Sequence, residues 1–216
     1  DVDVPRTHPE TKLFKPGGPF HGDLVNLLHI YSAFDRDMSY VQGMSYLAAF
    51  FITHMDAFSA FRCFANLLNT HFYRNLFKMN LTQMLRHMGA YDLLFERCMP
   101  ALFAHFKNLA ISPEQYLLDW FMTCFGRAFS LQTSSRIFDC LIIEGEVFLY
   151  RTALAILKLS EKQLLKADFE TLLPMFRVLS RELDEETLFA TIKSIKVPRE
   201  VREYIKRIVM ESPGKN

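Results

Sequence analysis

The chain has 216 residues, half of them hydrophobic, and its 25 Lys+Arg against 24 Asp+Glu leave a net charge of +1. A disordered chain needs low hydrophobicity and high net charge, so that class is excluded. A nucleic-acid-binding protein draws its affinity from clustered basic residues, and this charge balance argues against one. We therefore expect a soluble globular protein.

Hydrophobic residues recur with helical spacing along most of the chain. Leu24, Leu27, Leu28 and Tyr31 would lie on one face of a helix, and similar runs follow. The predicted helices are, in chain order, 20–34, 41–54, 57–69, 80–97, 100–107, 114–129, 133–143, 146–158, 168–179, 185–194 and 199–210. No segment alternates like a strand, so the sequence predicts an all-α fold.

Two features bear on the compartment of the protein. The four cysteines (Cys63, Cys98, Cys124 and Cys140) are widely spaced in apolar stretches, so we expect them to be reduced and buried in an intracellular protein. The longest uncharged run lies between Asp37 and Asp56 and contains several polar residues, which favours a buried helix over a transmembrane segment. The chain starts without Met or a signal peptide, as an excised piece of a longer protein would.

The usual signatures of an enzyme site are missing from the sequence. Its eight glycines form no phosphate-binding loop, and its seven histidines form no HExxH motif or pair at i, i+4. No GxSxG motif indicates a serine hydrolase. We expect no metal site and no bound cofactor, which counts against a self-contained hydrolase or metalloenzyme.

Two short segments depart from the helical pattern. The first is Asp3-Val4-Pro5-Arg6-Thr7, which taken alone could be an ordinary solvated turn. The second is Tyr40-Val41-Gln42-Gly43-Met44, where the glutamine could merely cap a helix. A glycine inside a helix costs about 1 kcal/mol relative to alanine, so Gly43 suggests the close approach of another backbone.

Together these segments, separated by 36 residues between Arg6 and Gln42, resemble the paired motifs of the TBC domain of Rab GTPase-activating proteins. Tyr116-Leu117-x-Asp119-Trp120-Phe121 resembles a later segment of that family. Arg136-Ile137-Phe138-Asp139, Glu144-Gly145 and the stretch 148–157 resemble the family's R-I-W-D-x4-E-G region and its continuation. Phe138 stands where the family usually has Trp, and Ser130 where it often has Pro.

The resemblance implies a two-lobed, all-α TBC domain over residues 1–216. The N-terminal lobe would cover 1–110 and hold both catalytic residues, and the C-terminal lobe would cover 111–216. The family's first motif begins with an Ile three residues before the Asp, so we expect the start of the domain to lie ahead of Asp1.

The resemblance also implies a function, that of an activator which supplies catalytic residues to a GTP-loaded Rab GTPase. Arg6 and Gln42 would be the two catalytic side chains, with GTP and Mg²⁺ bound by the Rab. The residues expected to support them are Asp3, Thr7, Tyr40 and Gly43, and those expected to pair helices or contact the partner are Arg136, Asp139 and Glu144. The protein would be cytoplasmic and recruited to membranes through other regions. The alternative is a silent scaffold that binds a Rab or another partner without accelerating hydrolysis.

Overall fold

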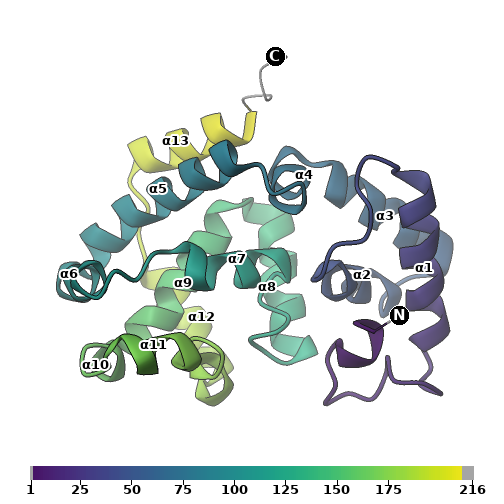
Figure 1. Ribbon diagram of the computed structural model, residues 1–216, viewed down its shortest axis with the longest axis horizontal. Helices are drawn as coiled ribbons and strands as arrows, with labels where there is room; N and C mark the ends of the chain where they lie inside the picture. Colours follow the sequence, from purple (N-terminus) through teal and green to yellow (C-terminus); the bar gives the residue numbers. More distant parts are fainter. Residues whose placement is uncertain (1, 211–216) are drawn as a thin grey trace. The chain divides into compact units, whose positions relative to one another are not determined.

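The computed structural model describes residues 2–210, and within this range it contains helices and no strand (Figure 1). The α-helices are α1 (His21–Phe34), α2 (Met44–Ile52), α3 (Ala57–Asn69), α4 (His71–Phe77), α5 (Leu81–Cys98), α6 (Pro100–Asn108), α7 (Glu114–Met122), α8 (Leu131–Glu144), α9 (Val147–Leu159), α10 (Glu161–Leu164), α11 (Phe169–Met175), α12 (Glu185–Ser194) and α13 (Arg199–Met210). Two 3₁₀ turns accompany them, η1 (Val4–Arg6) and η2 (Leu179–Glu182). The all-α prediction is confirmed. No helix in the described range is long and apolar enough to cross a bilayer.

The chain forms two compact units that alternate along the sequence. One comprises Asp1–Asn80 and Asp119–Phe138, and the other comprises Leu81–Leu118 and Asp139–Asn216. This division differs from a single break at residue 110, because the end of α7 and most of α8 pack with the first unit. The expected boundary between the two lobes of the TBC domain, after residue 110, stays a prediction.

The first unit is built around α2. Every residue of Met44–Ile52 is buried, which explains why this helix is apolar on all sides, and α1 and α3 pack against it. Its aromatic residues extend the core, since the ring of Phe50 stacks on Phe138 with 4.8 Å between centroids. Asp56 caps the start of α3 by accepting hydrogen bonds from two backbone N–H groups.

The second unit has α9 at its centre. Ten of the eleven residues from Val147 to Leu157 are buried, the exception being Arg151, and α12 and α5 pack against this helix. Arg151 is accommodated because its guanidinium donates to the Ile192 carbonyl at 2.9 and 3.1 Å and to Glu144 at 2.7 Å. Helix α13 lies along α5 (Figure 1).

The predicted helices overlap the observed ones in most places, and three differences stand out. The prediction for 114–129 is wrong beyond Met122, because Cys124 and Phe125 adopt left-handed backbone with φ of 44° and 59°. Two consecutive left-handed residues cannot continue an α-helix. Helices α4 and α10 were not predicted, since they are only seven and four residues long. The prediction for 168–179 is wrong beyond Met175, where α11 ends.

The cysteine prediction is correct in part. All four thiols are free, but only Cys124 is buried, while the other three are partly exposed. Burial raises the pKa of the Cys124 thiol, so this side chain behaves as a small hydrophobic group.

Candidate functional site

The first candidate catalytic residue, Arg6, ends the short 3₁₀ turn η1. Pro5 lies in the first turn of η1, where its fixed φ suits the backbone and its missing N–H costs no hydrogen bond. Val4 is buried at 2% exposure and fixes the turn to the core, whereas Arg6 is exposed. The turn therefore holds its backbone against the protein and presents the arginine side chain to solvent.

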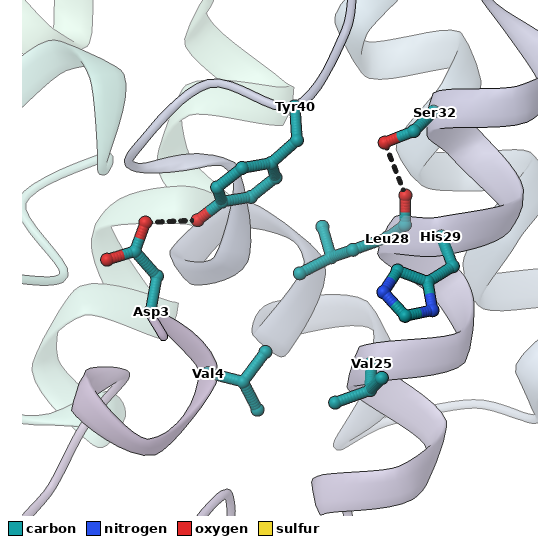
Figure 2. A pocket seen from close by; sticks show the side chains of 7 residues that line it. All are labelled: Asp3, Val4, Val25, Leu28, His29, Ser32 and Tyr40. Atoms are coloured by element: carbon teal, nitrogen blue, oxygen red, sulfur yellow. Dashed lines mark hydrogen bonds between the residues drawn. The ribbon is translucent and has the colours of Figure 1, made fainter. Parts of the chain in front are cut away.

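A hydrogen bond connects the segment of Arg6 with that of Gln42. The Tyr40 hydroxyl donates to Oδ2 of Asp3 over 2.7 Å, as Figure 2 shows. Burial, together with the bonded Asp3 carboxylate, raises the pKa of Tyr40, so the phenol remains a proton donor at neutral pH. Asp3 lies three residues before Arg6 and Tyr40 two residues before Gln42, so this bond joins the two loops.

Two further contacts hold the backbone of η1 against α2. The Thr7 hydroxyl lies 2.8 Å from the Ser45 hydroxyl and 3.0 Å from the Asp3 carbonyl. The Tyr46 hydroxyl donates to the Arg6 carbonyl over 3.0 Å. Because Ser45 and Tyr46 belong to a fully buried helix, they are rigid supports for Arg6.

Tyr46 is itself held by neighbours in the first unit. The guanidinium of Arg127 lies 5.6 Å from the centre of its ring, and Arg127 forms an ion pair with Asp119. Gly126 lies so close that a Cβ there would come within 2.7 Å of the Tyr46 ring. This glycine is required for close packing against the tyrosine that anchors the Arg6 backbone.

Gln42 and Gly43 occupy the turn that leads into α2. Gln42 is exposed, and Gly43 is the N-cap residue of α2 with φ of 105°. The expectation that Gly43 lies inside a helix is wrong, since α2 begins one residue later. The left-handed backbone of Gly43 is a conformation that most other residues adopt only with strain. A Cβ at this position would make only ordinary contacts of 3.5 Å with Met122 and Thr123, so the backbone angle and not space requires glycine.

The other predicted polar residues lie away from these loops in sequence and differ in environment. Arg136 and Asp139 are exposed on α8. Glu144, at the end of the same helix, forms an ion pair with Arg151 of α9 at 2.7 Å.

A small pocket lies beside the Asp3–Tyr40 hydrogen bond (Figure 2). Its volume is about 210 Å³ and its walls are largely apolar. The residues that line it are Asp3, Val4, Val25, Leu28, His29, Ser32 and Tyr40. Within residues 2–210, no three side chains of His, Cys, Asp or Glu converge in a way that could hold a metal ion.

Sequence reasoning missed several residues that support this site. They are Ser45, Tyr46 and Arg127. Each acts through a hydrogen bond or a cation–π contact with a residue 38 or more positions away in the chain, which no local pattern reveals. His8 was also missed, although it follows the expected supporting residue Thr7.

His8 is a buried histidine with no hydrogen bond to either ring nitrogen. Its exposure is 1%, its ring meets that of Tyr46 edge-on at 5.1 Å, and its φ is 41°. The exposed Glu10 carboxylate lies 3.4 Å from Nδ1, close enough to attract a protonated ring without making a hydrogen bond. Burial outweighs that attraction and lowers the pKa of His8, so the neutral ring is the folded form.

We expect the free energy of unfolding to fall as the pH is lowered through and below the unfolded histidine pKa of about 6.5. Because the pKa of His8 is lowered in the folded protein, the unfolded state binds the proton first as the pH falls. The contribution of neutral His8 to the free energy of unfolding is therefore complete above the unfolded pKa and is lost below it. One such group changes stability by at most about 1.4 kcal/mol per pH unit. Urea unfolding of wild type and His8→Asn between pH 8 and 5 measures it, since asparagine tolerates the left-handed backbone. Equal slopes for both proteins would contradict the account.

Comparison with known proteins places this arrangement in a family. The model of the Rab-GTPase-TBC domain matches residues 1–165. TBC1 domain family member 14 of Homo sapiens is 40% identical over 196 residues, which cover 91% of this chain and 28% of that protein. Drainin of Dictyostelium discoideum is 37% identical over 194 residues, covering 89% of this chain and 44% of that protein. The chain belongs to the Rab-GTPase-TBC domain family.

Solved structures agree with this assignment. The chain resembles the crystal structure of the Chlamydomonas flagellar RabGAP TBC domain with a TM-score of 0.70 at 26% identity, covering 83% of this chain and 60% of that one. It also has the fold of the Ypt/Rab-GAP domain of GYP1P, with a TM-score of 0.75 at 18% identity over 90% of this chain and 70% of that one. The matched part of this chain spans less than a third of the length of TBC1 domain family member 14 of Homo sapiens.

Proposed function

We propose that this protein activates a Rab GTPase by supplying Arg6 and Gln42 to the nucleotide site of its partner. Family membership supports the class of activity. The observation that carries the proposal is the Tyr40–Asp3 hydrogen bond, which ties together two loops whose candidate catalytic side chains are both exposed. Exposed side chains on anchored backbones suit groups that must reach into another protein.

Arg6 would stabilise the transition state of GTP hydrolysis. Negative charge spreads over the transferring phosphoryl oxygens in this reaction, and an arginine inserted by a partner accelerates it by about 10³- to 10⁵-fold. The guanidinium is planar, always protonated and able to contact two oxygens at once. The Tyr46 hydroxyl, bonded to the Arg6 carbonyl, would hold the backbone while the side chain extends.

Gln42 would orient the attacking water. Its carboxamide has both an acceptor and donors, so it can bind the water and a γ-phosphate oxygen together. Gly43 supplies the left-handed turn that places Gln42 at the entrance to α2. GTP and Mg²⁺ would be held by the Rab, and Asp3, Thr7 and Tyr40 would position the two loops without touching the nucleotide.

The proposed partner is a GTP-loaded Rab at a vesicle or organelle membrane. Because curated relatives are longer than this chain, we propose that other regions of the full-length protein recruit it to the cytoplasmic face of that membrane.

Single-turnover GTP hydrolysis across a panel of Rab GTPases tests the proposal. We expect strong acceleration of a few members, with hydrolysis by the rest near its intrinsic rate. Binding of GTP-loaded Rabs without acceleration would contradict the proposal and favour the silent scaffold.

A further inference from the structure

The loop that carries Gln42, residues 35–43, is fixed at its first residue by an ion pair. Asp35 is the C-cap residue of α1, and its Oδ2 accepts a hydrogen bond from Nη1 of Arg74 in α4 over 2.8 Å. The two side chains are only 15% and 29% exposed. A pair this shielded is screened less by solvent and salt than a surface pair.

Both partners of this ion pair make a second contact. The same Nη1 of Arg74 lies 3.0 Å from the side-chain oxygen of Asn69, so the guanidinium is held within its own region of the unit. The other oxygen of Asp35 accepts a hydrogen bond from the backbone N–H of Asp37 over 3.1 Å. One carboxylate therefore connects α4 to the first turn of the loop.

The charge of Asp35 is maintained by this partner. Burial would raise the pKa of Asp35, but the hydrogen bond and positive charge of Arg74 outweigh it and lower that pKa. Tyr31, whose pKa rises to about 12 through burial and the neighbouring Asp35 charge, stays protonated beside the pair. Asp35 is thus ionised and available to Arg74 at neutral pH.

Between Asp37 and α2, the loop is held at separate points. Met38 is buried at 3% exposure and its N–H donates to the Asp35 carbonyl over 3.3 Å, Tyr40 donates to Asp3, and Gly43 caps α2. Gln42 lies near the end of this loop. We expect the direction in which the loop leaves α1 to affect the position of the Gln42 side chain.

We propose that Arg74 is a positioning residue for Gln42, acting through Asp35 on the loop of residues 35–43. This inference rests on the proposed role of Gln42 in GTP hydrolysis. Arg74 reaches the loop through the Asp35 carboxylate, and both side chains are mostly buried. We therefore expect its loss to lower the maximal rate and to leave the affinity for the GTPase nearly unchanged.

A double-mutant cycle tests this coupling under single-turnover conditions at varied activator concentration. Arg74→Ala should lower the maximal rate about tenfold, since a displacement of about 1 Å can cost about a hundredfold and the Tyr40–Asp3 contact would limit the displacement of Gln42. The half-saturating activator concentration should change less than about twofold. In a Gln42→Ala background the same substitution should lower the rate less than about twofold, because the group that it positions is gone.

Two further variants serve as controls. Arg74→Lys should recover most of the rate, because an ammonium can still pair with Asp35. Arg62→Ala is the matched control, since Arg62 is an exposed arginine of α3 whose guanidinium lies 5.7 Å from the centre of the Phe58 ring. An equal loss in the wild-type and Gln42→Ala backgrounds, or no loss at all, would overturn the inference.

A second measurement keeps this inference separate from the proposed function. Backbone ¹⁵N order parameters of residues 36–42 in the free protein should fall in Arg74→Ala and in Asp35→Asn, while those of α2 remain unchanged. If wild type activates no GTPase, the proposed function fails and this measurement still decides whether Arg74 orders the loop. Unchanged order parameters in a folded Arg74→Ala protein would overturn the inference.

Discussion

Replacing Arg6 by alanine is expected to lower the acceleration of GTP hydrolysis by about 10³- to 10⁵-fold. The loss is large because Arg6 is the positively charged group that this protein is proposed to bring to the phosphoryl oxygens, where negative charge develops. Stopped-flow or quench measurements of single-turnover hydrolysis on a responsive Rab would give the rate. Arg6→Lys should also lose most of the activity, since an ammonium cannot contact two oxygens in a plane.

The fold should survive the loss of the Arg6 side chain. Arg6 is exposed, and its anchoring contact uses the backbone carbonyl, so the Tyr46 hydrogen bond remains in the variant. We expect the free energy of unfolding to change by less than about 1 kcal/mol. Arg62→Ala, on α3, is the control that should keep full activity. Retention of activity in Arg6→Ala would exclude Arg6 as the catalytic arginine, and a large loss of stability would show a structural role instead.

The second large effect is expected at Gln42. Gln42→Ala should lower the maximal rate by about 10²- to 10³-fold, the range seen when one positioned polar group is removed from a transition state. The half-saturating concentration should change little if the side chain acts on the water and not on binding. The same single-turnover experiment, carried out over a range of activator concentrations up to saturation, measures both quantities.

Gln42→Asn separates chemistry from reach, because it keeps the carboxamide and shortens the side chain by one methylene. We expect it to be nearly as inactive as Gln42→Ala, since orientation of a water depends on position. Gln132→Ala removes an exposed glutamine at the start of α8 and should be active. If the Gln42 variants accelerated hydrolysis like wild type, the attacking water would have to be oriented by another group, such as a residue of the Rab.

Local pattern was sufficient for most helices of the fold. Helices α3, α12 and α13 begin and end at the predicted residues, because amphipathic spacing and acidic caps such as Asp56 and Asp184 act within a few positions. The end of α7 could not be predicted this way. The backbone at Cys124 and Phe125 is left-handed although the apolar spacing of that stretch is helical, and both side chains are fully buried in the folded chain.

The sequence by itself determined the all-α class and the two short motifs, because each depends on residue type and short-range spacing. The resemblance of those motifs to the TBC family made Arg6 and Gln42 the candidate catalytic residues. Only the tertiary structure decided what holds these residues in place. The Tyr40–Asp3, Tyr46–Arg6 and Arg74–Asp35 contacts join residues separated by 37, 40 and 39 positions. Contacts over such distances form only when the chain closes on itself around α2, so no helical period or capping signal contains them.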